Sequence, residues 1–596
     1  MTPVAATPGV GTVDFLGGST NIDASNISLT DNGKNYYGTY FNDDWKISPK
    51  LTVNLGLRWD FFGLVYEHHG AQANFVPSGA PTGGPMYLLP GGTNPADLSS
   101  SFTTLLAADG IALDITNKYG KGLGNSQKSN FAPRVGFAYQ ATPKLVARGG
   151  FGMFYNGFEN RGYSPNLGEN YPFQFNFTYG QPNDWTPRTF PGCAAAGPGG
   201  TATFETGFAC TPLVPTAVLA NGLALRGIQF NYQTPYTMSG NFTLQYQLTP
   251  TMTVQAGYVT SLARHLEVFP GSNNPTAILP TGLSLTNTAG ANGGPGSGAV
   301  PASQGGLPFP DFGGNNSYAA TAGNSFYHGL QTKAEKRFAS GLNFLVTYTY
   351  SKTRTDAVDL LNGGSNAGYR VPDVTGLGIH YDYGLADFDI RNVFHLSGEY
   401  QLPFGKGKRY FANGGAGSKI LGGWSVNATG VLQGGQPITL TCPTNTVSTT
   451  AGSNCYDLIV AGQSPKRGLH IDSNGKLSFF GNPGAFSQPA PCTASPCPLS
   501  AVGGPPDQIA GPTFKRMDFS VFKNFQLTER FRMEFRSEFF NLLNHPNFNA
   551  PNFGGNGVVA VPNSGNFTSS SFGEIGSTRD APYDPRQIQF ALKLYY

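Results

Sequence analysis

The sequence predicts an all-β chain, folded as an antiparallel transmembrane β-barrel of the outer-membrane type with short periplasmic turns and long extracellular loops. Three observations predict this fold. Segments of about ten residues alternate between apolar and polar positions, which is the period of a strand with two different faces. Short turns alternate with long Gly-, Pro- and Asn-rich stretches. Only 12% of the 596 residues are charged and 13% are aromatic, so many rings need an apolar environment.

The bulk composition excludes several other classes of protein. The formal net charge of +3 gives no reason to expect a nucleic-acid partner. No apolar run reaches the roughly 18 residues of a membrane-spanning helix. No nucleophile, base and orienting group form a recognisable arrangement, so the sequence predicts no enzyme. It also predicts no cofactor and no bound metal.

The first hairpin is the clearest one. A turn at Ser48-Pro49-Lys50 is followed by two interleaved sets of residues. The apolar set is Leu51, Val53, Leu55, Leu57, Trp59 and Phe61, and the polar set is Thr52, Asn54, Gly56, Arg58 and Asp60. This is the pattern of a strand with one apolar and one polar face, and residues 36–47 are its expected partner.

The same construction recurs along the chain. Further hairpins are expected around the turns at 142–144, 249–251, 339–341 and 527–530, and single strands at 173–179, 391–402 and 422–433. Long loops are expected at 66–130, 156–235, 262–322, 351–390 and 434–512. The count is about 14–18 strands, against about 22 in a full transporter barrel.

A soluble β-sandwich or propeller would also alternate. A sandwich, however, needs turn signals about every 8–12 residues at both ends of its sheets. The strict alternation of short and long connections, and the large aromatic residues near strand ends, favour a membrane barrel.

Charged residues in the expected strands are confined to the polar face. In a barrel this face lines the lumen, where charges hydrate the wall, hold a plug by ion pairs or line a route. The candidates are Arg58, Asp60, Arg148, Lys333, Glu335, Arg337, Arg532, Glu534, Arg536 and Glu538.

The six cysteines fall in three local pairs: Cys193 with Cys210, Cys442 with Cys455, and Cys492 with Cys497. All six lie in the long loops. An even number of locally paired cysteines predicts disulfides and an oxidising compartment. The alternative is three pairs of free thiols.

The chain ends in a strand pattern, residues 587–596. Ile588, Phe590, Leu592, Leu594 and Tyr596 alternate with mostly polar residues. A closed barrel has no free edge, so a strand that completes it can run to the last residue.

Five segments together resemble the barrel of Oar-like TonB-dependent receptors, in the order of that family: residues 39–60, 131–156, 327–353, 389–410 and 517–548. The resemblance covers the chain from about residue 34 onward, as a TonB-dependent receptor-like barrel over 34–596 after an irregular segment, 1–33. The terminal residues Ile588, Phe590, Leu592, Leu594 and Tyr596 are similar to the β-signal that the barrel-assembly machinery reads.

The resemblance implies an active transporter in the cell outer membrane that takes up a large or scarce solute, such as an oligosaccharide, a peptide or a metal chelate. Family members carry an export signal, a TonB box and a plug domain before the barrel, and residues 1–33 have no room for them. We therefore expect a C-terminal portion of a receptor, without its plug and incomplete at the N-terminal side of its barrel.

The expected partners are outer-membrane lipid, the barrel-assembly machinery and an unknown solute. The TonB complex is a partner only if a plug and a TonB box are supplied upstream. Two other hypotheses remain at this stage: a structural or adhesive outer-membrane barrel without transport activity, and a secreted, soluble β-rich binding protein.

Overall fold

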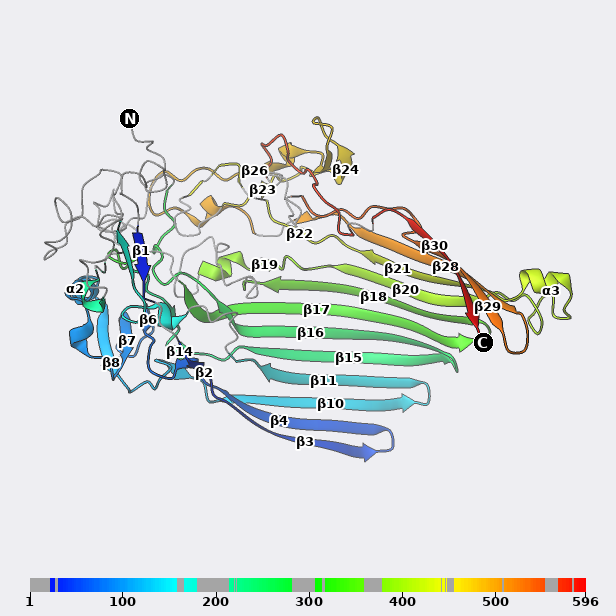
Figure 1. The fold of residues 1–596 in the computed structure, drawn as a ribbon, viewed down its shortest axis with the longest axis horizontal. Coiled ribbons are helices and arrows are strands. Elements are labelled where there is room, and N and C mark those ends of the chain that lie inside the picture. Colours follow the sequence, from blue (N-terminus) through cyan, green and yellow to red (C-terminus); the bar gives the residue numbers. More distant parts are fainter. Residues whose placement is uncertain are drawn as a thin grey trace.

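The computed structural model is dominated by one large antiparallel sheet (Figure 1). It describes residues 22–26, 30–157, 166–179, 214–218, 220, 222–280, 306–313, 317–357, 378–440, 442–444, 446–447, 455–505, 509–551, 566–580 and 584–596. Thirteen strands follow one another in sequence order through the sheet, and β13 (Gly227–Ile228) and β19 (Gly384–Leu385) pair beside this path. The thirteen are β3 (Tyr36–Ser48), β4 (Leu51–Phe62), β10 (Asn130–Thr142), β11 (Leu145–Tyr155), β15 (Tyr236–Thr249), β16 (Met252–Val268), β17 (Tyr318–Ala339), β18 (Leu342–Thr355), β20 (Asn392–Gln401), β21 (Trp424–Gln433), β28 (Phe514–Gln526), β29 (Arg532–Phe540) and β30 (Gln587–Tyr595).

The short turns form where the sequence predicts them, and their residues explain why. The Ser48 hydroxyl accepts hydrogen bonds from the N–H groups of Lys50 and Leu51, and the Thr142 hydroxyl does the same for the corresponding residues of the β10–β11 turn. Such side-chain acceptors stabilise a turn locally. In the β17–β18 turn, Ser340 and Gly341 both have positive φ, 54° and 81°. This is the conformation of a two-residue hairpin loop that matches the twist of its strands.

Two sequence predictions about strands and turns are corrected by the structure. Residues 173–179 were expected to add a strand to the main sheet, which we call the wall. Instead, β12 (Asn176–Tyr179) pairs with β1 (Ile22–Ser25) outside the wall, so the wall has one strand fewer there. The connection 402–423 lies on the short-turn side and is not short, since it contains helix α3 (Ala416–Leu421). A further long connection, 541–586, joins β29 to β30.

The sheet is open between β3 and β30 in the described residues, where each of these strands pairs with one neighbour, β4 and β29 respectively. The last strand was expected to be a closing strand, but in the described residues β30 pairs with β29 and does not close this sheet. Strands β3 and β30 both run from the loop side to the turn side, because twelve antiparallel steps separate them. A closed antiparallel barrel with an even number of strands needs an odd number of further strands between them.

The described parts of the long connections gather at one end of the sheet, with α2 (Ser100–Ala108) and the small sheet β6 (Asn74–Val76), β7 (Met86–Pro90) and β8 (Ala112–Thr116) (Figure 1). We call this assembly the loop layer. Smaller pairs within it are β2 (Asn32–Gly33) with β5 (Tyr66–Glu67), β9 (Asn125–Ser126) with β14 (Asn231–Tyr232), β22 (Pro437–Ile438) with β27 (Ile509–Ala510), β23 (Leu458–Ile459) with β26 (Phe486–Ser487), and β24 (Arg467–Ile471) with β25 (Leu477–Phe480). Short 3-10 helices lie at Pro95–Asp97, Leu167–Glu169, Pro215–Ala217, Gly378–Asp382, Pro483–Ala485 and Leu499–Val502.

The N-terminal segment 1–33 was expected to be irregular. Its described part contains β1 and β2, whose pairing partners β12 and β5 come from the long loops. Partners distant in sequence supply the hydrogen bonds of these two short strands, and the assignment of 1–33 as an irregular segment stays a prediction. Within the described residues no helix is long and apolar enough to cross a membrane.

Candidate functional site

One face of the main sheet is mostly apolar across all thirteen strands. Asp43, Lys336 and Lys523 also lie on it, opposite Leu55, Phe344 and Phe535, so the prediction that strand charges are confined to the polar face is wrong for these residues. In the ladder, Leu55 lies opposite Val135, and Val135 lies opposite Phe151. The same register continues to the other edge, where Phe535 lies opposite Leu592. Side chains on this face are unusually exposed, including Phe41 at 71% and Phe590 at 68%. An apolar surface of this extent requires an apolar solvent, and the acyl region of a bilayer supplies one.

The terminal residues of the expected β-signal lie on this face. Ile588, Phe590, Leu592 and Leu594 are members of β30 and face the same way as Phe539 and Met533 of β29. Tyr596 follows β30, which ends at Tyr595, and is 91% exposed. Recognition of this strand by the assembly machinery stays a prediction.

The ten predicted charges lie in strands β4, β11, β17 and β29, in register on the opposite face. Neighbours two positions apart on a strand share a face, so they can form ion pairs. Arg58 Nε lies 2.9 Å from the Asp60 carboxylate, and Lys333 Nζ lies 2.6 Å from that of Glu335. Arg536 pairs with Glu534.

In the part of the chain that the structure describes, the other four predicted charges form no ion pair, and two of them make contacts of another kind. Arg337, near the end of β17, donates a hydrogen bond to the Pro250 carbonyl in the β15–β16 turn, at 3.2 Å. The Arg532 guanidinium lies 4.5 Å from the Tyr595 ring centroid. Arg148, Arg337, Arg532 and Glu538 form no ion pair within the described ranges. We retain the interpretation that all ten line the lumen as a proposal.

The loop layer has apolar cores of its own, separate from the sheet. The largest contains Phe102, which helix α2 presents to the rings of Tyr87, Tyr171 and Phe312 at centroid distances of 5.1, 4.6 and 6.1 Å. Helix α2 begins after Ser99, whose hydroxyl accepts a hydrogen bond from the Phe102 N–H as a cap. The long loops on this side therefore form a packed structure.

Three buried asparagine amides hold different loops together, and no sequence pattern marks them. The Asn74 amide donates hydrogen bonds to the Leu123 and Ile228 carbonyls and accepts one from the Ile228 N–H. Asn170 bonds the backbone of residues 73 and 226, and Asn273 that of residues 309, 312 and 313. An amide with both donors and an acceptor satisfied is stable when buried. Their partners are up to 154 residues away in sequence, so local pattern could not reveal them.

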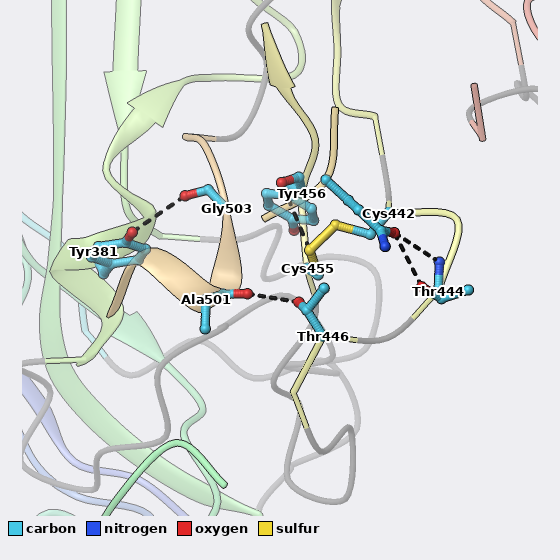
Figure 2. Close-up of a disulfide and its surroundings, with 9 residues drawn as sticks. Tyr381, Cys442, Thr444, Thr446, Cys455, Tyr456, Ala501 and Gly503 are labelled. Carbon is cyan, nitrogen blue, oxygen red and sulfur yellow. Dashed lines mark hydrogen bonds between the residues drawn. A yellow bond between two sulfur atoms is a disulfide. The ribbon is translucent and has the colours of Figure 1, made fainter. Parts of the chain in front are cut away.

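Two disulfides lie in the loop 434–513, Cys442–Cys455 and Cys492–Cys497. Figure 2 shows the first of them beside two contacts between segments. The Tyr381 hydroxyl donates to the Gly503 carbonyl at 3.3 Å, and the Thr446 hydroxyl donates to the Ala501 carbonyl at 2.7 Å. The disulfides thus belong to the same packed layer. The predicted pair Cys193 and Cys210 lies outside the described residues.

Asp457 is a buried carboxyl close to the first disulfide. Its side chain is 2% exposed, and burial raises the pKa of Asp457 from 3.8 to about 7. The folded loop layer therefore holds a proton between these pH values that the unfolded chain releases. Stability from this group is fully present below pH 4 and is lost as pH rises through 7.

We expect Asp457→Asn to remove this pH dependence and to stabilise the loop layer at pH 8, by about tenfold in the local unfolding constant (about 1.4 kcal/mol). Amide hydrogen exchange of residues 438–510 at pH 5 and pH 8 would measure it. A variant with the same pH 5 to pH 8 change as the native protein would exclude the buried-acid explanation.

The described loop layer also contains a pocket of about 580 Å³, the basic loop pocket. Its charged or titratable lining residues are Lys466, Arg467, Lys515 and His545, and the lining contains no carboxylate. The pocket can therefore accept an anionic group by charge-assisted hydrogen bonds.

Comparison with known proteins gives one family match. The family model described as "Outer membrane beta barrel domain" matches residues 3–589. No curated protein matches the chain.

Solved structures with a related arrangement include three receptors or transporters. The pyoverdine outer membrane receptor FpvA from Pseudomonas aeruginosa PAO1 is 8% identical, with a TM-score of 0.38, over 95% of this chain and 43% of that one. The ferric yersiniabactin uptake receptor FyuA from Yersinia pestis is 9% identical, with a TM-score of 0.36, over 95% of this chain and 46% of that one. The FrpB iron transporter from Neisseria meningitidis is 10% identical, with a TM-score of 0.35, over 95% of this chain and 46% of that one. The chain spans less than half the length of each of these three proteins.

Proposed function

Because this chain belongs to the outer membrane beta barrel domain family, we propose that its sheet forms part of the wall of an Oar-like, TonB-dependent receptor that takes up a large or scarce solute. The family places the chain in the cell outer membrane. The solute class is an oligosaccharide, a peptide or a metal chelate. TonB is a partner of the complete receptor, through a plug and a TonB box supplied with the barrel.

The observation that carries the proposal is the packed loop layer on one side of the sheet. A sheet that served only as a membrane anchor would not need a second apolar core in its loops, such as the one that buries Phe102, Tyr87 and Tyr171. Ordered loops held by a rigid scaffold are where binding surfaces are usually found. The opposite end of the sheet has mostly short turns, so the loop layer lies only at the end that faces the outside of the cell.

The basic loop pocket favours a solute with an anionic part. Lys466 and Arg467 come from one loop segment, while Lys515 is the second residue of β28, so the pocket joins the loop layer to the wall. A ferric chelate bearing carboxylates or an acidic oligosaccharide would satisfy these donors. On the polar face, the ion pairs Arg58–Asp60 and Lys333–Glu335 would then line the lumen through which the solute passes.

The test is uptake by cells that produce the complete receptor, with and without functional TonB. A panel of ferric chelates, acidic oligosaccharides and peptides is supplied at low concentration. We expect at least one anionic solute to enter only when TonB is functional. We also expect Lys466→Gln/Arg467→Gln to raise its half-saturating concentration by about tenfold, the loss expected for a charged hydrogen bond.

Lys118→Gln/Lys476→Gln is the matched control, since it removes two exposed cations of the loop layer that do not line the pocket. Solutes that bind to the cell surface but never enter would favour the structural or adhesive alternative. Uptake that is unchanged without TonB would contradict the proposal.

A further inference from the structure

A group of cations lies on the apolar face of the sheet, at its loop end. Along β18 the apolar face carries Tyr348 and Tyr350, and the next two positions on that face are Lys352 and Arg354. Arg264 occupies the corresponding end of β16. We call Arg264, Lys352 and Arg354 the rim cations. Two residues of strand cover about 7 Å, so Lys352 lies one step and Arg354 two steps beyond Tyr350, towards the lipid headgroups.

Aromatic rings order two of these cations. The Arg264 guanidinium lies 4.2 Å from the Phe326 ring centroid, and the Arg354 guanidinium lies 5.9 Å from that of Tyr383. Phe326 and Tyr383 are themselves in edge contact at 5.8 Å, and Phe326 is the ladder partner of Arg354. The rings therefore hold Arg264 and Arg354 on either side of one aromatic pair. Planar cations ordered in this way keep N–H donors for a further ligand. The exception is Arg264 Nη1, which donates to the Ala263 carbonyl at 2.9 Å.

The surroundings do not neutralise the rim cations. Among the described residues, none of the three forms an ion pair with a carboxylate. The nearby Asp389 accepts the Thr353 backbone N–H, and Asp356 is 2.6 Å from His380. Arg391 adds a further positive charge close to Lys352. A cation cluster next to an exposed apolar face calls for a ligand that is both anionic and lipidic.

A polar pocket adjoins the cluster. It has a volume of about 440 Å³ and is lined by amides, hydroxyls and one imidazole, among them Asn125, Gln127, Asn231, Gln233 and His265. Tyr236 connects the pocket to the cluster. Its ring lies 5.6 Å from that of His265 in the pocket wall, and its ladder partner is Arg264. Amide and hydroxyl groups without a carboxylate match the hydroxyl groups of a sugar.

We propose that the rim cations and the adjoining polar pocket bind a phosphorylated glycolipid of the outer leaflet: the acyl chains lie on the apolar face, phosphate contacts Arg264, Lys352 and Arg354, and the sugar reaches the pocket at Tyr236. Each part of the surface matches one part of such a lipid. The proposal depends on membrane insertion, but on neither solute uptake nor TonB.

The test uses the purified full chain in micelles. Binding is measured with lipopolysaccharide, with the same lipid after enzymatic removal of its phosphates, and with inorganic phosphate alone. We expect Arg264→Gln/Lys352→Gln/Arg354→Gln to weaken lipopolysaccharide binding by at least about tenfold, since each contact is charge-assisted. Dephosphorylation should weaken binding to the native protein to a similar extent. Arg354→Gln alone, at an exposed position, should give a smaller loss and guards against misfolding of the triple variant.

The control is Lys406→Gln/Lys408→Gln/Arg409→Gln, which removes three exposed cations at the opposite end of the strands, in the 402–423 connection. It should bind lipopolysaccharide as the native protein does. Equal losses in both triple variants would show general charge attraction and overturn the proposal. Equal binding of the dephosphorylated lipid, or full competition by inorganic phosphate at equimolar concentration, would overturn it as well.

Discussion

Replacing Leu244 by Arg is expected to destabilise the folded wall by about 2–4 kcal/mol, the cost of an arginine facing lipid near the middle of a bilayer. Leu244 lies midway along β15 on the apolar face, between its ladder partners Ala147 and Ala256. Its side chain is 44% exposed, so no protein group is available to solvate a charge there. Chemical unfolding in lipid vesicles, followed by heat-modifiable gel mobility, would measure the loss.

The control is the next residue. Gln245→Arg places the same charge on the polar face, where the ladder partners are Val146 and Gln255. We expect it to cost less than about 1 kcal/mol, because that face is hydrated. If the two variants lose the same stability, the assignment of the apolar face to lipid is wrong.

Replacing Phe102 by Ala is expected to unfold the loop layer while the wall stays intact. Truncating a fully buried phenylalanine typically costs about 3–5 kcal/mol, and Phe102 is 0% exposed among three aromatic neighbours. Its core contains no residue of the thirteen strands of the main sheet, so the damage should stay local. Limited proteolysis should cut the native loops slowly and the variant loops at once, while the gel mobility of the wall is unchanged.

Thr104→Ala tests whether this effect is specific. Thr104 lies on the same helix, α2, but is exposed. It should leave proteolysis unchanged. Rapid cleavage of both variants would mean that the helix, and not the aromatic core, holds the layer together.

The wall was predictable because its information is local. The alternation of apolar and polar residues over Leu51–Phe62 predicts both the strand and its two faces. In three of the short turns a Ser or Thr hydroxyl accepts the N–H of the residue two positions later, a Lys or Thr, and so stabilises the turn. The ion pairs Arg58–Asp60 and Lys333–Glu335 also follow from that pattern, since positions two apart share a face. The family match and the sheet agree with this part of the prediction.

The loop layer was not predictable, because its contacts are remote in sequence. Asn74 finds partners at residues 123 and 228, and Asn170 finds partners at residues 73 and 226. No periodicity marks such pairs. The placement of residues 173–179 failed for a related reason: the segment has strand character, but whether such a segment joins the wall or the loop layer depends on its partner.

The most direct test of the central claim, that the apolar face contacts lipid, is a spin label at each of two adjacent positions, Leu244→Cys and Gln245→Cys, with the protein in bilayers. Label mobility and collision rates with oxygen and with a water-soluble nickel complex are then compared. We predict that the label at 244 is relaxed by oxygen and protected from nickel, and that the label at 245 shows the reverse. Equal nickel access at both positions would contradict it.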